Sequence, residues 1–192
     1  MNIKENKPVI KLTLSAMFMA IGLVLPFFTG QIPQIGNLLL PMHIPVFLCG
    51  LICGWQYGFG VGFALPLIRS LLIGRPNLFP TATAMAFELA AYGLVVGLLY
   101  WRSHRQNIIA LYCSMILAMF AGRIVWGIVQ TVLLGFGESR FTWQLFITNG
   151  FLNAIPGIIL QLILIPAIIT ALNRAGLIKP LNQKQAVHNG EG

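Results

Sequence analysis

The polar residues that interrupt the apolar stretches of this 192-residue chain are few, and their spacing groups them. Arg123 is followed by Trp126 and Gln130 three and seven residues later, which places all three on one face of a helix. Asn149 and Asn153, four residues apart, share a helical face in the same way. The other members of this set are Glu88, Arg69 and His43. An arginine can hold a carboxylate through two parallel hydrogen bonds, so the set predicts a binding site for a small molecule rather than a catalytic one.

The charge of this set is predicted to be positive. Arg69 and Arg123 outweigh Glu88, and Arg75 stands at the rim. A positive pocket favours an anionic or carboxylate-bearing ligand, and aromatic residues nearby would supply its apolar wall. The candidate wall residues are Phe79, Phe87, Trp126 and Trp143.

Each of these residues also has a purely structural interpretation. Glu88 could form an ion pair between helices with Arg123 or Arg69, and the two asparagines could hydrogen-bond to neighbouring helices. His43 could begin a helix, and Trp126 could pack in the core. Because a polar group facing lipid is costly, and because the whole set falls in one half of the predicted bundle, we expect a shared cavity open to the outside.

The stretches that carry these residues are long enough to cross a membrane. Of the residues, 57% are hydrophobic and 8% are charged, with a mean hydropathy of +0.84, whereas soluble domains carry about 25% charged residues. With about 20 apolar residues per crossing, the sequence predicts an all-α integral membrane protein with six transmembrane helices. We expect one domain over residues 1–180 and a polar cytoplasmic tail over residues 181–192. The predicted spans are Leu12–Phe28, Leu38–Gly54, Tyr57–Ile73, Pro80–Trp101, Ile108–Leu134 and Trp143–Leu172.

The distribution of basic residues predicts the orientation of these spans. Lys and Arg collect in cytoplasmic loops. With the N-terminus inside, the outer loops hold only Arg75 and Arg140, so we expect both termini in the cytoplasm and the chain in a bacterial plasma membrane. The net charge of +8 then reflects topology rather than nucleic-acid binding. The basic residues on the inner side are Lys4, Lys7, Lys11, Arg102, Arg105, Arg174, Lys179 and Lys184.

Motifs for catalysis, nucleotide binding or metal binding are missing from the sequence. It contains no GxxxxGKS/T, HExxH or GxSxG pattern. Cys49, Cys53 and Cys113 lie in apolar runs and are predicted to be buried hydrophobic residues rather than a disulfide or metal site. We therefore expect a binding protein that is not an enzyme and needs no cofactor or metal.

Small residues recur at intervals of four and predict close helix packing. Glycines of the second, third and fourth spans are expected to pack within the bundle. Ala16 and Ala20 differ, because they lie in an otherwise apolar half of the first span, where a partner helix could dock. The glycines concerned are Gly50, Gly54, Gly58, Gly62, Gly93 and Gly97.

Six spans in under two hundred residues, the Ala-x-x-x-Ala pair and the polar outer half together resemble the substrate-binding S components of energy-coupling-factor (ECF) vitamin transporters. The resemblance covers essentially the whole chain. The segments 39–54 (LLPMHIPVFLCGLICG), 65–74 (LPLIRSLLIG) and 87–93 (FELAAYG) are most similar to the pantothenate-type branch. Riboflavin, pyridoxine and folate carriers share the architecture, and a stand-alone carrier driven by an ion gradient through Glu88 is the alternative from another class.

The resemblance implies a division of labour among subunits. The S component captures the vitamin outside, while a membrane coupling subunit (the T subunit) and two cytoplasmic ATPases drive its release inside. It also implies that Ala16 and Ala20 meet the coupling subunit. The ligand would lie beneath the loops Thr29–Asn37 and Gly74–Phe79.

Overall fold

The described chain is all-helical, which confirms the predicted fold class. The computed structural model describes residues 7–29, 40–103, 107–135 and 154–176. Five of the helices in these ranges are long and apolar enough to cross a membrane, and α3 is a shorter apolar helix. The elements are α1 (Lys7–Thr29), α3 (His43–Cys53), α4 (Trp55–Ile73), the single wide turn η1 (Leu78–Ala82), α5 (Thr83–Arg102), α6 (Ile108–Gly135) and α8 (Ile155–Arg174).

The second predicted span is shorter than expected. Its helix, α3, begins only at His43, after Leu40 with a positive φ of 47°, and ends at Cys53. The next residue, Gly54, has a φ of 106°, which glycine adopts readily, and it separates α3 from α4. The last helix begins at Ile155 with Pro156 in its first turn, where the missing N–H costs nothing. Residues 143–153 of the last predicted span, and the predicted tail, lie outside the described residues.

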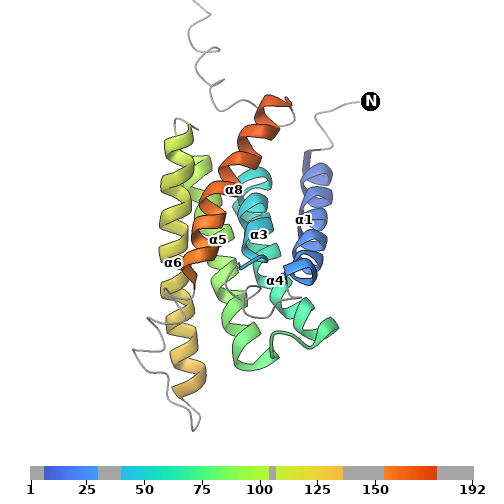
Figure 1. Cartoon of the computed structure of the whole chain (residues 1–192), viewed down its shortest axis with the longest axis vertical. Helices are drawn as coiled ribbons and strands as arrows, with labels where there is room; N and C mark the ends of the chain where they lie inside the picture. Colours follow the sequence, from blue (N-terminus) through green and yellow to red (C-terminus); the bar gives the residue numbers. More distant parts are fainter. Residues whose placement is uncertain (1–6, 30–39, 104–106, 136–153, 177–192) are drawn as a thin grey trace, which may run out of the picture.

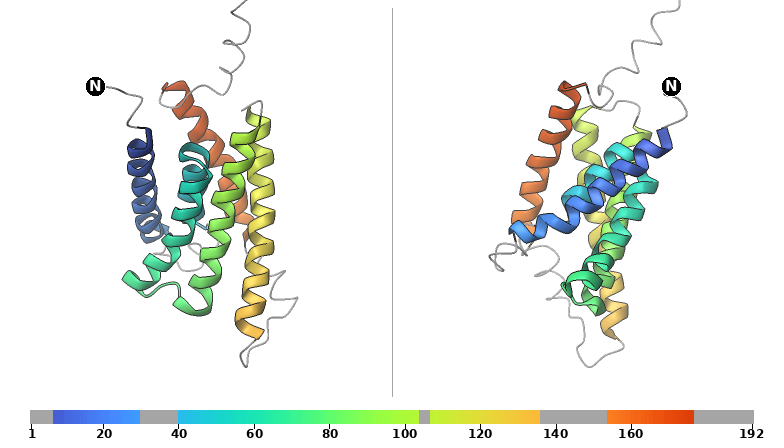
Figure 2. Two further views of the ribbon diagram at one scale, coloured as in Figure 1. Left: turned by 180° about the vertical axis from the view of Figure 1, so that it is seen from behind. Right: turned by 90° about the vertical axis from the view of Figure 1, so that its right-hand side faces the viewer.

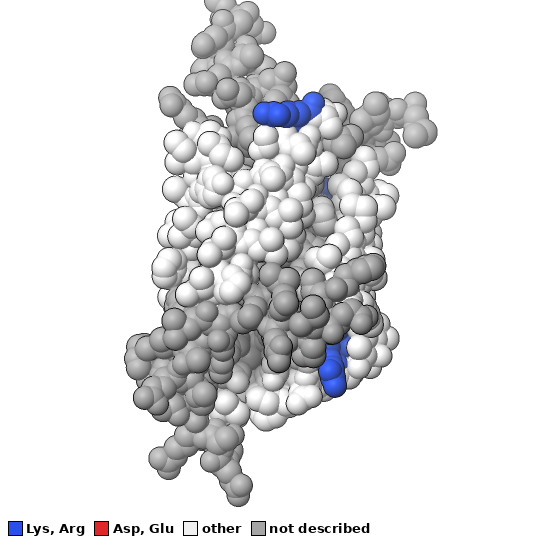
Figure 3. Space-filling view, viewed as in Figure 1, with Lys and Arg blue, Asp and Glu red and all other residues white. Residues whose placement is uncertain are grey.

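Helix α5 lies at the centre of the bundle (Figures 1 and 2). It packs against α3, α4 and α6, while α1 runs obliquely across α3 and α4, and α8 touches α3 and α6. The start of α1 and the end of α8 lie at the same end of the bundle (Figure 1). On the face seen in Figure 3, the basic side chains in view lie toward the upper and lower ends of the described part. This is the arrangement expected of helices that cross an apolar layer.

Glycines allow α3, α4 and α5 to approach one another closely. A Cβ added at Gly93 would overlap the backbone of Gly58, and one at Gly50 would lie 2.7 Å from the carbonyl oxygen of Gly93. A Cβ at Gly97 would lie 2.6 Å from the Cα of Trp55. The spaced glycines of these helices therefore serve internal packing, as the sequence predicts. Gly54 is the exception, because a Cβ there would meet nothing within 4 Å; its positive φ ends α3 instead.

We predict that Gly93→Ala destabilises the bundle by about 1–3 kcal/mol, because the added methyl group must push α4 away from α5. Gly60→Ala is the matched control, because a Cβ there meets nothing within 4 Å. It should leave stability unchanged or raise it slightly, since alanine favours a helix over glycine. Unfolding of both variants in detergent, followed by circular dichroism, measures the difference. Equal stability of the two variants would contradict the role of Gly93.

Candidate functional site

Three helices bring Glu88, Arg123 and His43 together inside the bundle. Arg123 Nη1 of α6 lies 2.9 Å from Glu88 Oε1 of α5. His43 is the first residue of α3, and its Nε2 lies 3.8 Å from the same carboxylate oxygen. The exposed fractions are 2% for Glu88, 6% for Arg123 and 2% for His43. From the sequence, either Arg123 or Arg69 could pair with Glu88. In the structure the partner of Glu88 is Arg123.

Tyr92 completes this cluster and is not among the site residues predicted from the sequence. Its hydroxyl donates a hydrogen bond of 2.7 Å to Glu88 Oε1 from one helical turn along α5. Its ring lies between His43 and Phe47, with centroid distances of 5.2 Å and 5.3 Å. A Cβ at Gly122 of α6 would overlap the Tyr92 ring, so that glycine makes room for it. The spacing of four residues between Glu88 and Tyr92 was the signal available in the sequence.

The late start of α3 sets the position of the cluster along the bundle. His43 is the first of the 11 residues of α3, so it lies ten residue steps, a rise of about 15 Å, from Cys53 at the other end of the helix. Because an unpaired charge inside an apolar bundle is costly, pairing Glu88 with Arg123 is what lets both residues stay buried.

The net charge of the cluster is lower than the positive charge predicted from Arg69, Arg123 and Glu88. Glu88 is the single acidic residue in the part of the chain that the structure describes, and it neutralises Arg123. Arg69 is not joined to this pair. Its Nε donates to the carbonyl oxygen of Arg75 at 3.2 Å, and its guanidinium lies 5.9 Å from the centre of the Phe27 ring. The two arginines therefore do not share one pocket: Arg123 lies beside Glu88, and Arg69 lies beside Arg75 and Phe27.

Several buried polar atoms, of the ion pair's own residues and of two glutamines, have no hydrogen-bond partner within the described ranges. An unpaired polar atom in an apolar interior is costly, so each is a place where a bound molecule could donate or accept a hydrogen bond. They are both ring nitrogens of His43, Nε of Arg123, Oε1 of Gln130 and Nε2 of Gln161. Gln161 comes from α8 and is not among the site residues predicted from the sequence.

The remaining predicted site residues fall in different places. Trp126 and Gln130 are partly buried on α6, beyond Arg123. Asn149 and Asn153 lie outside the described residues, as does Trp143. Phe79 and Phe87 are exposed and do not form the expected apolar wall. Phe87 instead meets the edge of Phe63 on the surface, and the rings inside the cluster are those of Tyr92 and Phe47.

Helix α1 turns Ala16 and Ala20 away from the bundle. Its inner face is fixed by Ser15 and Gly22: Cys49 Sγ lies 3.5 Å from Ser15 Oγ, and a Cβ at Gly22 would lie 2.6 Å from Leu65. Ser15 and Gly22 are buried, whereas Ala16 and Ala20 are exposed. At 100° per residue the two alanines lie on the side of α1 that faces away from the bundle.

A family described as "ECF transporter, substrate-specific component" matches residues 10–169 of the chain. No curated protein and no solved structure matches it. Members of this family are membrane subunits that bind the substrate of an importer and work with coupling and ATPase subunits, and they are not enzymes. The match begins in the first turn of α1, ends within α8 and includes the whole buried cluster. The chain therefore belongs to the family of substrate-specific components of ECF transporters.

Proposed function

We propose that this protein is the high-affinity subunit of an ATP-driven ECF importer and captures a small anionic vitamin, with pantothenate as the favoured ligand. The observation that carries the proposal is the buried cluster of Glu88, Arg123, His43 and Tyr92 inside the bundle. An ion pair can hold helices together without leaving donors and acceptors unused around it. The atoms of His43, Arg123 and Gln130 that have no hydrogen-bond partner among the described residues favour a ligand instead.

The ligand's carboxylate would accept a hydrogen bond from Nε of Arg123, which has no partner among the described residues. Arg123 would keep its bond to Glu88 through Nη1 while Nε donates to the ligand. His43 and Gln130 would supply further polar contacts, and Trp126 would supply an apolar surface. We assign Asn149 and Asn153 to the same site from their sequence positions, whereas Arg69 lies apart from it, beside Arg75 and Phe27.

Pantothenate combines one carboxylate with hydroxyl groups and an amide. Those groups match a site with one available guanidinium nitrogen and several neutral donors and acceptors. The likeness of segments 39–54, 65–74 and 87–93 to the pantothenate-type branch supports the same choice. Riboflavin, pyridoxine and folate are the competing ligands.

The exposed Ala16 and Ala20 would form the docking face for the membrane coupling subunit, which works with two cytoplasmic ATPases. Small side chains allow two helices to approach closely in a membrane. We also propose that the end of the bundle with Lys11, Arg102 and Arg174 faces the cytoplasm of a bacterial cell, with both chain termini on that side.

Purified protein should bind pantothenate with submicromolar affinity in the absence of ATP, because the site lies within this chain alone. Isothermal titration against a panel of pantothenate, riboflavin, pyridoxine and folate measures this. Preference for another member of the panel would overturn the choice of pantothenate but not the capture of a vitamin. Absence of binding to every vitamin, or uptake into proteoliposomes without the ATPases, would contradict the proposed function.

A further inference from the structure

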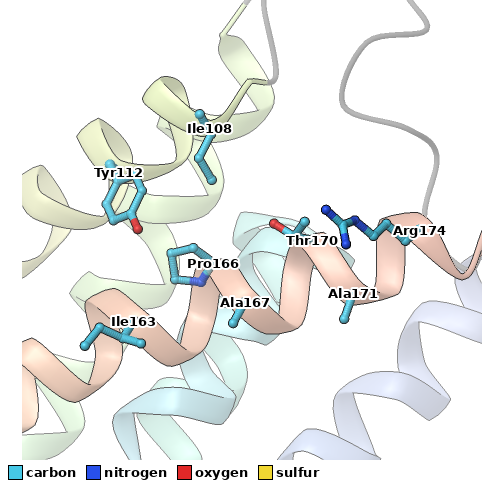
Figure 4. Close-up of a pocket in the computed structure, with 8 residues that line it drawn as sticks. All are labelled: Ile108, Tyr112, Ile163, Pro166, Ala167, Thr170, Ala171 and Arg174. Carbon is cyan, nitrogen blue, oxygen red and sulfur yellow. The ribbon is translucent and has the colours of Figure 1, made fainter.

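An open groove lies between α6 and α8, on a different part of the molecule from the buried cluster (Figure 4). Its volume is about 500 Å³, within the range of about 300–1,000 Å³ that small-molecule sites occupy. Tyr112 projects from α6 toward Pro166 of α8, and Thr170 and Arg174 follow along α8 (Figure 4). The rest of the lining is apolar and includes Ile163, Ala167 and Ala171.

The groove has a polar end and an apolar end. Arg174 is the last residue of the apolar span Ile155–Arg174, so its guanidinium lies where that span meets the membrane surface. Ile163 lies eleven residues earlier, about 16 Å deeper at the rise of an α-helix. A molecule that fits this gradient has an anionic head and an apolar tail.

Arg174 has no acidic partner in the described part of the chain. The single carboxylate there belongs to Glu88, which is buried and paired with Arg123 in another part of the bundle. Arg174 itself is exposed. Basic pockets between transmembrane helices at the cytoplasmic surface bind the head groups of anionic lipids.

We propose that this groove binds an anionic phospholipid of the membrane leaflet at the α8 C-terminus. Arg174 holds the phosphate, the hydroxyl group of Thr170 lies one helical turn below it, and one acyl chain runs along Tyr112, Pro166, Ala167 and Ile163. The two alanines and the proline leave the space that the chain fills. This site is independent of the vitamin.

Native mass spectrometry of the purified protein, with phosphatidylglycerol or phosphatidylcholine added separately, tests the proposal. Wild-type protein should retain phosphatidylglycerol in preference to phosphatidylcholine. R174Q should weaken phosphatidylglycerol binding about five-fold, as expected when one arginine near an anionic surface is lost. R102Q is the matched control, because Arg102 is exposed at the same end of the bundle but does not line the groove. It should leave the binding unchanged.

A second variant tests the shape of the groove rather than its charge. Ala167→Leu combined with Ala171→Leu fills the groove while Arg174 remains, and it should also remove bound phosphatidylglycerol without lowering the unfolding temperature. Equal retention of both lipids by wild-type protein, or equal losses in R174Q and R102Q, would overturn the site. So would an R174Q variant that keeps its lipid but no longer co-purifies with the coupling subunit, because the groove would then belong to that partner. Because none of these measurements uses a vitamin, failure here leaves the proposed function untouched.

Discussion

Replacing Arg123 with methionine should destabilise the protein by about 3–5 kcal/mol, because it leaves the buried carboxylate of Glu88 without a partner. Methionine is close to arginine in length and apolar, so the loss measures the broken ion pair rather than an empty space. Unfolding in detergent, followed by circular dichroism, gives the change. Arg102→Met is the control, since Arg102 is exposed and its loss should change stability by no more than about 0.5 kcal/mol.

The double variant Glu88→Gln with Arg123→Met separates folding from binding. Glutamine can still accept the hydrogen bond of Tyr92 and needs no counter-charge, so most of the lost stability should return. Vitamin binding should not return, because the free Nε of Arg123 is gone. A stable double variant that binds its vitamin as tightly as the wild type would show that the pair serves only the fold, and would remove Arg123 from the proposed site.

Replacing both Ala16 and Ala20 with leucine should abolish vitamin uptake in cells while leaving vitamin binding by the purified subunit intact. Both alanines are exposed on α1, so the larger side chains fit the bundle but prevent close approach of a partner helix. Uptake of radiolabelled vitamin and co-purification with the coupling subunit measure the first effect. Isothermal titration measures the second.

Gly60→Leu is the control for added bulk on an exposed helix, because nothing lies within 4 Å of a Cβ at Gly60. It should preserve both uptake and assembly. Loss of vitamin binding in the Ala16 and Ala20 variant, with assembly preserved, would mean that this face belongs to the fold of the subunit itself and would rule it out as a docking surface.

The sequence predicts the helices well because the membrane makes their pattern simple. An apolar stretch of about 20 residues can satisfy its backbone hydrogen bonds only as a helix, so α1, α4, α5 and α6 follow from hydropathy. The late start of α3 could not be predicted in this way. Leu40 and Pro41 are apolar, and hydropathy does not distinguish a turn from a helix when both are buried.

The sequence predicts which residues form the site better than it predicts which of them contact one another. Glu88, Arg123 and His43 are conspicuous in apolar surroundings, and all three meet in the structure. Which arginine pairs with Glu88 depends on how α4 and α6 are rotated against α5, and the sequence does not record those rotations. Tyr92 and Phe47 were overlooked because aromatic residues are common in membrane helices, and only the packing around Gly122 shows where Tyr92 lies.

The late start of α3 also has an electrostatic consequence. The N-terminus of a helix carries about half a positive elementary charge from its aligned peptide dipoles. In α3 this end is at His43, inside the bundle and beside Glu88. Because Glu88 and Arg123 cancel each other, the helix dipole leaves a positive field at the centre of the cluster. An anion that enters would be attracted by the backbone itself, through a charge that no count of side chains includes.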